Sequence, residues 1–240
     1  MSFLGDFFNA ILYQPLFNAL ILLYEYLPGR DFGVAIIALT LLIKLVLYPL
    51  GSMAIKAQKN LSQLQPKVEE IQKKYKQDKE RLVKETLALY KKEKINPFSG
   101  LLPLLIQLPI LIAFFQVFWR GFSQEQLKYL YSFVPLPGLI DTSFLGIMDL
   151  ATPNFALAVL AGVAQFWQTK MMTPHQKIGG GQAPSKTPDF SKMMQKQMLY
   201  FLPVLTVLIL WRLPSAIGLY WAVTSLFTIG QQYLVWSKKT

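Results

Sequence analysis

Long apolar stretches, separated by charged or loop-forming segments, run along most of the chain. A helix needs about 20 predominantly apolar residues to cross the hydrocarbon core of a bilayer. Several stretches approach or reach this length, and we predict that each is a membrane-spanning helix. Their five ranges are 32–50, 101–119, 144–169, 197–212 and 213–237. The pattern therefore predicts an all-α, polytopic membrane protein.

The N-terminal residues 1–31 have a different pattern. Apolar residues at helical spacing form one side of this segment, and polar residues such as Gln14 and Asn18 interrupt the other. Pro28 and Gly29 are expected to end the helix. We predict an amphipathic helix that lies on the outer membrane surface. A sixth span is the alternative, and it would move only the N-terminus to the inner side.

The segment 51–100 is highly charged and has the pattern of two antiparallel helices. Apolar residues step by three and four positions on both sides of a polar turn at 76–79. The first stripe consists of Leu61, Leu64, Val68, Ile71 and Tyr75, and the second of Val83, Leu87 and Tyr90. We predict a cytoplasmic helical hairpin in which the two stripes pack together, as in a coiled coil.

Positive charge predicts the orientation, because Lys and Arg are enriched in cytoplasmic loops. The chain has 24 Lys and Arg against 13 Asp and Glu, a formal net charge of +11. Of the basic residues, 12 lie in 51–100, 5 in 169–198 and 2 in the tail 238–240. This distribution places the N-terminus and the loop 120–143 outside and the C-terminus in the cytoplasm. The Gly- and Pro-rich segment 170–196 is expected to be a flexible cytoplasmic loop.

Composition excludes several classes of chemistry. Because the chain has no cysteine, it has no disulfide, thiolate metal site or cysteine nucleophile. Its one histidine, His175, lies in a polar stretch, which argues against a zinc site or a histidine-based triad. The uncharged parts of the spans offer no carboxylate pair for an intramembrane aspartyl protease. We expect no enzyme activity, no metal and no cofactor, and topology explains the excess charge without a DNA partner.

Lys44 is the one charged residue in the first predicted span. In a helix that ends at residue 50, it would lie about 9 Å from the inner boundary. A lysine in the hydrocarbon core costs about 2.5–3.5 kcal/mol on insertion scales. The ammonium must therefore meet water, a partner or polar side chains. Snorkelling of the side chain to the inner headgroups is the alternative.

Uncharged polar residues lie in the same predicted spans. Each of them alone is explained by a hydrogen bond between helices. Around an unpaired cation, they together favour a hydrophilic groove that is open to the cytoplasm and closed to the outside. These residues are Thr40, Gln107, Gln165, Gln168, Thr224 and Thr228. Such a groove can receive a short polar or acidic stretch of another chain and lower the cost of moving it across the bilayer.

Two groups of motifs resemble those of the YidC family of membrane protein insertases, and the resemblance covers residues 12–236. The first group is Gln65-Pro66-Lys67, Lys74-Tyr75-Lys76, Leu89-Tyr90-Lys91-Lys92-Glu93, Asn96-Pro97, Leu102-Pro103 and Gln107-Leu108-Pro109-Ile110. The second is Leu199-Tyr200-Phe201-Leu202-Pro203-Val204, Leu213-Pro214-Ser215, Gly218-Leu219-Tyr220-Trp221 and Thr228-Ile229-Gly230-Gln231-Gln232. The resemblance implies five helices around a groove open to the cytoplasm and to lipid. It also implies insertion of nascent membrane proteins, alone or with the Sec translocon, and a chaperone role in their folding. We expect the membrane to be a bacterial plasma membrane, with the membrane of an organelle as the alternative.

Site residues also follow from the resemblance. The family's groove usually carries an arginine in the first core span, and Lys44 stands at that position. The charge is therefore kept, whereas the bidentate fork of a guanidinium is lost. Other positions that match groove or substrate-contacting residues are Thr40, Gln165 or Gln168, Tyr220 and Trp221.

Further expectations concern partners and form. The basic hairpin suits anionic lipids or ribosomal RNA, so contact with a translating ribosome is expected through the cytoplasmic loops. The chain resembles the short form of the family, without a large periplasmic domain. The lipoprotein cysteine and the extended basic tail of some relatives are not found in this sequence.

A small polytopic transporter or channel is the main alternative function. Transporters of this kind are often built from internal repeats with paired interrupted helices. We find no internal repeat, and five spans do not divide into two equal halves. Uptake by the purified protein in vesicles, measured against insertion of a small membrane protein, distinguishes the two classes.

Overall fold

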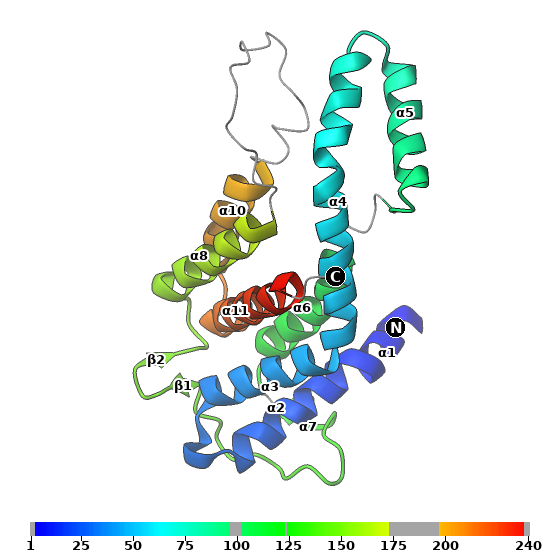
Figure 1. The fold of residues 1–240 in the computed structure, drawn as a ribbon. Helices are drawn as coiled ribbons and strands as arrows, with labels where there is room; N and C mark the ends of the chain where they lie inside the picture. The colour runs from blue at the N-terminus through cyan, green and yellow to red at the C-terminus, as the bar shows by residue number, and fades with distance from the viewer. Residues whose placement is uncertain (1–2, 97–101, 123, 173–196, 238–240) are drawn as a thin grey trace.

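The protein is mostly helical in the computed structural model (Figure 1). The structure describes residues 3–96, 102–122, 124–172 and 197–237. The helices are α1 (Phe3–Phe8), η1 (Asn9–Tyr13), α2 (Gln14–Tyr26), η2 (Pro28–Arg30), α3 (Phe32–Val46), α4 (Tyr48–Lys74), α5 (Lys79–Lys92), α6 (Leu102–Arg120), α7 (Gln124–Leu127), α8 (Phe155–Met172), η4 (Gln197–Phe201), α10 (Leu202–Leu210) and α11 (Ser215–Ser237). The strands β1 (Ser143–Phe144) and β2 (Met148–Asp149) form an antiparallel hairpin. The predicted all-α class is confirmed, with this small hairpin added.

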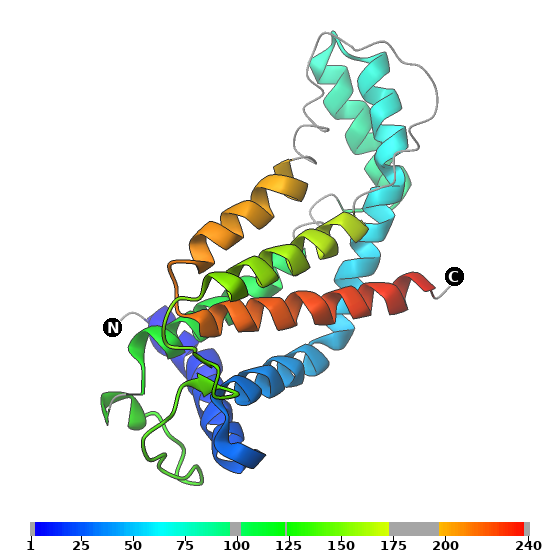
Figure 2. The ribbon, with the colours of Figure 1, turned by 90° about the vertical axis from the view of Figure 1, so that its left-hand side faces the viewer.

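The elements α1, η1 and α2 form one N-terminal helix. Its buried side packs against α3 and α6 and includes Tyr13, Phe17, Leu20, Ile21 and Tyr24. Asn18, which was predicted on the polar side, is buried with them. Two residues of the predicted apolar face, Phe7 and Ile11, are exposed. Figure 2 shows this helix running steeply across the direction of α11. Its position relative to the bilayer stays a prediction.

The first predicted span ends earlier than expected. The sequence pattern indicated a helix over 32–50, but α3 ends at Val46 and α4 begins at Tyr48, with a bend of 68° between them. Pro49 in the first turn of α4 explains the break, because a proline lacks the N–H and clashes with the preceding turn of a continuous helix. The predicted helical hairpin therefore begins at Tyr48, where α4 begins, and not at residue 51.

The predicted helical hairpin is present as α4 and α5, and it extends away from the other helices (Figure 1). Leu64 and Val68 of α4 are buried, as expected. The expectation for α5 is wrong in part, because Val83 and Leu87 are exposed, whereas Leu82 and Leu89 are half-buried. Positions 82 and 89 follow the same helical period, so periodicity alone could not distinguish the two stripes.

An ion pair fixes the end of the hairpin. The Lys67 Nζ lies 2.5 Å from Glu93 Oε1. This hydrogen-bonded ammonium holds the pKa of the Glu93 carboxyl below its ordinary value. At the other end of the hairpin, Asp78 caps α5 by accepting a hydrogen bond from the Arg81 backbone N–H at 3.0 Å.

The third predicted span begins later than expected. The pattern indicated a helix from residue 144, but residues 144–154 form the β hairpin and turns, and α8 begins at Phe155. Pro153 precedes the helix, and Asn154 Oδ1 accepts a hydrogen bond from the Leu157 N–H at 3.1 Å. This is a helix N-cap, which stops the apolar segment from forming one longer helix.

Helix α11 lies at the centre of the packing. It contacts α3, α4, α6, α8 and α10. Gly162 of α8 allows close approach to α10, since a Cβ at this position would meet the Val207 side chain. The last two predicted ranges, 197–212 and 213–237, are helical over η4–α10 and over α11, and whether these helices span the membrane stays a prediction.

Few helices meet both the length and the composition of a span. In the described residues, the unbroken helix Gly5–Tyr26 meets both, as do α3 and α4 together as a bent pair. The segments Leu105–Arg120 and Leu199–Leu210 are apolar but shorter. The count of five spans therefore stays a prediction. The loop beyond Met172 and the tail 238–240 lie outside the described residues.

Candidate functional site

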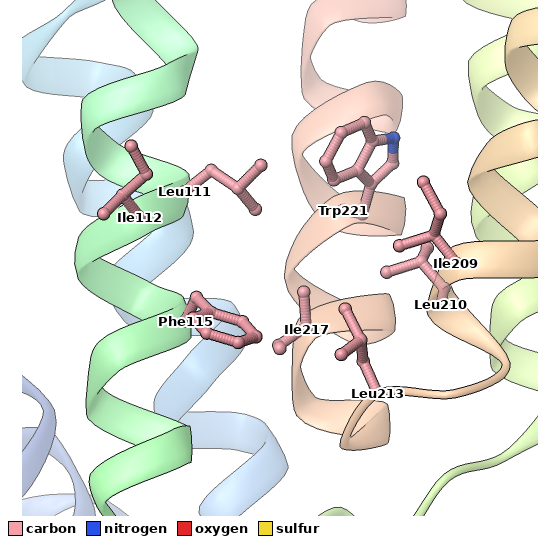
Figure 3. Close-up of a pocket in the computed structure, with 8 residues that line it drawn as sticks. All are labelled: Leu111, Ile112, Phe115, Ile209, Leu210, Leu213, Ile217 and Trp221. Atoms are coloured by element: carbon pink, nitrogen blue, oxygen red, sulfur yellow. The ribbon is translucent and has the colours of Figure 1, made fainter.

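An apolar pocket lies between α6 and α10, with α11 at its base (Figure 3). Its volume is about 180 Å³. The lining side chains are Leu111, Ile112, Phe115, Ile209, Leu210, Leu213, Ile217 and Trp221. We call these residues the α11 pocket. Of the site residues predicted from the sequence, only Trp221 belongs to it.

Helices α6 and α11 run antiparallel along the pocket. Figure 3 shows Leu111 near the level of Trp221 and Phe115 near the level of Ile217. The two helices α6 and α10 both pack on α11 and stand on opposite sides of the pocket. The pocket is therefore a space with two helical walls and one helical floor.

Beyond the pocket, the face of α11 that carries Ile217 and Trp221 becomes polar toward the C-terminus of the helix. Ile217, Trp221, Thr224 and Thr228 follow one another by four, three and four residues, a spacing that places them along one face of the helix. Thr224 is buried and Thr228 is half-buried. The Thr228 hydroxyl donates a hydrogen bond to the Thr224 carbonyl at 2.8 Å. We call Thr224, Thr228 and Lys44, which lie beyond the residues that line the pocket, the polar end.

Lys44 reaches this polar end from α3. Its Nζ donates a hydrogen bond to Thr228 Oγ1 at 3.3 Å, and the side chain is half-buried. Within the described residues, no carboxylate forms an ion pair with it. The cation is thus held by a neutral hydroxyl, which leaves it able to attract an incoming negative charge.

The expected depth of Lys44 is revised by the bend at Leu47. Lys44 stands in the last turn of α3, not six residues before the end of a span. The partial negative charge at a helix C-terminus stabilises a cation by about 0.3–1 kcal/mol. The lysine therefore lies closer to the end of its helix than predicted, which lowers the cost of its burial.

Gln107 and Tyr220 meet between α6 and α11. The Gln107 side-chain amide donates a hydrogen bond to the Tyr220 hydroxyl. The Tyr220 ring is almost fully buried and stacks on Phe114, with 4.2 Å between the ring centroids. Gln107 and Tyr220 thus meet between α6 and α11. The stacked rings of Tyr220 and Phe114 pack between the same two helices.

Three other predicted residues form no side-chain hydrogen bond with Lys44 in the described structure. The buried Thr40 hydroxyl donates to the Ile36 carbonyl of its own helix at 2.6 Å. Gln168 contributes only its backbone carbonyl, which accepts a hydrogen bond from Gln232 Nε2 at 3.4 Å. The side-chain oxygen of Gln165 is buried without a hydrogen-bond partner. The structure therefore brings Lys44 and Thr228 together, and Gln107 and Tyr220, but not all the predicted residues.

Gln231 is a contact that the sequence analysis did not assign. Its Nε2 donates hydrogen bonds to the Tyr48 carbonyl at 2.8 Å and to Ser52 Oγ at 2.9 Å. It thereby ties α11 to the first turns of α4, directly after the bend. The signal in the sequence was an amide pair, with Gln232, in an otherwise uncharged helix.

The described residues contain no group of three or more His, Asp and Glu that could hold a metal ion. What the arrangement offers is a surface for binding. Along one face of α11, the pocket residues Ile217 and Trp221 are followed by Thr224 and Thr228, and Thr228 bonds Lys44.

Comparisons with known proteins agree on one family. A family model described as 60Kd inner membrane protein matches residues 22–240. The chain is 37% identical over 207 residues to the membrane protein insertase YidC of Clostridium tetani, covering 86% of this chain and 82% of that protein. It is 38% identical over 210 residues to the protein of the same name from Fusobacterium nucleatum, covering 87% of each. A longer relative of that name, from Syntrophus aciditrophicus, is 32% identical over 224 residues, which are 92% of this chain and 36% of that protein.

Proposed function

Since the chain belongs to the 60Kd inner membrane protein family, the family of the YidC insertases, it is a membrane protein insertase, and we propose that the α11 pocket and its polar end form one substrate groove. Apolar walls and a floor that turns polar suit a polypeptide with a hydrophobic helix and a polar flank. The resemblance found in the sequence is confirmed, whereas the groove and its residues are our proposal.

The observation that carries the proposal is the place of Lys44. Its ammonium is half-buried, held by Thr228, and without an ion-pair partner among the described residues. Two unit charges about 4 Å apart attract each other by about 4 kcal/mol where the effective dielectric constant is near 20. This is comparable to the roughly 2.5–3.5 kcal/mol that a charged residue costs at the centre of a membrane helix. One cation can therefore offset the cost of admitting one acidic residue.

The end of α3 and the direction of α4 support an opening of the groove beside Lys44. Helix α3 ends at Val46, two residues beyond Lys44, and α4 turns away by 68°. A polar segment entering near Lys44 would thus reach Thr228 and Thr224 without passing along the whole of α3. We propose that this end faces the cytoplasm, because the Lys-rich hairpin begins beside it.

A hydrophobic segment leaves by a different part of the same groove. The α11 pocket is lined by apolar side chains, and Ile112 and Ile209 on its two walls are each about half exposed. In a membrane, this exposed edge meets acyl chains. A client helix can therefore exchange contacts with Phe115 and Trp221 for contacts with lipid, without exposing its backbone to water.

Topology and partners complete the proposal. We place the N-terminus outside and the C-terminus in the cytoplasm, with five spans and the N-terminal helix on the outer surface. The steep inclination of that helix to the direction of α11 in Figure 2 supports the interfacial position. The exposed basic surface of α4 and α5 suits the translating ribosome and anionic lipids. Cooperation with the Sec translocon is a further proposal, and we assign no catalytic step or cofactor.

A charge series at Lys44 tests the groove. In cells depleted of their own insertase, we would compare the chain with Lys44→Arg, Lys44→Ala and Lys44→Glu for insertion of a single-span client with an acidic outer tail. We expect Lys44→Arg to work, Lys44→Ala to be slower, and Lys44→Glu to lose about tenfold or more, since about 1.4 kcal/mol changes a rate tenfold. A client with a neutral tail is the control and should depend less on the charge.

The insertion activity of Lys44→Glu also provides the result that would contradict the proposal. If Lys44→Glu inserts the acidic client as well as the unchanged chain does, electrostatic attraction at Lys44 is not part of the mechanism. Protein levels measured by immunoblot separate the expected loss of insertion from a loss of folded protein.

A further inference from the structure

The segment between α6 and α8 exposes large apolar side chains outside the helices. Figure 1 shows this loop, with β1 and β2, at the same end of the molecule as α7. Leu139 is fully exposed, and the others are exposed by 61–76%. These residues are Phe133, Leu136, Leu139, Leu145 and Ile147, which we call the loop apolar surface.

Several polar groups of this loop form hydrogen bonds within it. Asp141 Oδ1 accepts a hydrogen bond from the Ser143 N–H at 2.9 Å. Asp149 Oδ1 accepts hydrogen bonds from Thr142 Oγ1 at 2.6 Å and from the Ala151 N–H at 2.8 Å. A loop in water usually presents polar groups and keeps its large apolar ones covered. This loop leaves five large apolar side chains uncovered.

The most apolar part of the loop also lacks charge and has few backbone donors. Residues 133–140 contain no charged side chain, and Pro135 and Pro137 have no N–H to satisfy. The cost of moving this backbone out of bulk water is therefore lower than for an ordinary loop.

The loop is held firmly by the N-terminal helix. Asn18 Nδ2 donates a hydrogen bond to the Tyr129 carbonyl at 2.8 Å, and its Oδ1 accepts one from the Tyr131 N–H at 2.7 Å. Farther along, the Asp141 N–H donates to the Tyr24 hydroxyl at 3.0 Å. The apolar side chains are thus presented by a fixed backbone, so their exposure does not come from a loose segment.

We propose that the loop apolar surface is embedded in the boundary between headgroups and acyl chains of the membrane leaflet that surrounds this end of α6 and α8. Continuity with the lipid-facing helices supports lipid as the occupant. Trp119 at the end of α6 and Phe155 at the start of α8 are both exposed, and aromatic side chains are enriched at this depth of a bilayer. The absence of charge in 133–140 favours an apolar environment over an ionic partner. The loop is then a membrane anchor that holds α2 and the ends of α6 and α8 at one depth.

Site-specific fluorescence tests the anchor. The chain has no cysteine, so Leu139→Cys and Ile147→Cys each give one site for an environment-sensitive dye. Glu125→Cys on α7 is the matched control, because its side chain is exposed at the same end of the molecule. In phospholipid vesicles at high lipid-to-protein ratio, we expect dyes at 139 and 147 to emit at shorter wavelength than at 125. Lipids with a nitroxide near the headgroup end of an acyl chain should quench the dyes at 139 and 147 several-fold more strongly than the dye at 125.

Two outcomes would overturn the proposal. Water-like emission that iodide quenches at 139 and 147 would place the loop in solvent. Short-wavelength emission that nitroxide lipids do not quench would show that a protein surface, such as a second copy, covers the loop instead.

Discussion

At the scale of single residues, Lys44 illustrates how a buried charge is tolerated. Its burial is opposed by desolvation, but its position in the last turn of α3 and its hydrogen bond to Thr228 both favour the charged form. The sequence identified this lysine as the unusual residue, yet its depth depended on a helix end that the apolar pattern did not reveal. The sequence shows a proline at residue 49, but it does not show that the chain bends by 68° just before it.

Gly33 provides a test of packing at one residue. A Cβ there would overlap the Phe144 ring, which the β hairpin places against the start of α3. We expect Gly33→Ala to destabilise the folded protein by about 1–3 kcal/mol, the usual cost of overpacking. Thermal unfolding in detergent micelles measures the change.

The matched control is another helical glycine. A Cβ at Gly230 meets nothing within 4 Å, so Gly230→Ala should be neutral or slightly stabilising through its higher helix propensity. Equal melting temperatures for the two variants would show that Phe144 does not pack on Gly33 as described.

At the scale of elements, the bend between α3 and α4 sets the direction of the hairpin. Gly51 lies against Gln231, since a Cβ at residue 51 would come within 3.0 Å of the side-chain amide. The Gln231 amide also bonds the Tyr48 carbonyl and Ser52 Oγ. Helix α11 thus holds both Lys44, through Thr228, and the start of α4.

Replacing this amide should loosen the bend. Gln231→Leu leaves the Tyr48 carbonyl and the Ser52 hydroxyl without their partner, and we expect a loss of about 1–3 kcal/mol in the free energy of unfolding. Spin labels at the exposed residues Gln63 and Tyr233 should show a broader distance distribution by pulsed electron resonance. Gln232→Leu is the control, because the Gln232 amide faces the Gln168 carbonyl of α8. A distribution unchanged by Gln231→Leu would contradict this role.

The hairpin shows where periodicity succeeds and fails for an element. Buried Leu64 and Val68 were predicted, because α4 carries one clear apolar stripe. Helix α5 carries two adjacent stripes, and the choice of Leu82 and Leu89 over Val83 and Leu87 depends on how α5 is rotated against α4. Local sequence does not determine that rotation.

At the scale of the whole molecule, the sequence predicted the helical class, the hairpin and the family from apolar patterning and motifs. It did not predict the β hairpin at Ser143–Asp149, because a short apolar segment before a helix has the same composition as the helix itself. The candidate groove was predicted in part. Lys44 and Thr228 meet, as do Gln107 and Tyr220, whereas Gln165 and Gln168 form no hydrogen bond with either pair in the described structure. Contacts between helices distant in sequence decide these differences.

Water access to Thr228 is the most direct test of the central claim, that a hydrated groove with Lys44 at its polar end opens to the cytoplasm. Thr228→Cys keeps Lys44 and places the chain's one thiol beside it. Leu226→Cys is the matched control, since Leu226 lies two residues away on α11 and is 54% exposed on a side of the helix away from Thr228. We predict that a membrane-impermeant maleimide labels residue 228 from the cytoplasmic side only, and leaves 226 unlabelled. Labelling of 228 from the outer side, or from neither side while the denatured protein reacts, would contradict the account.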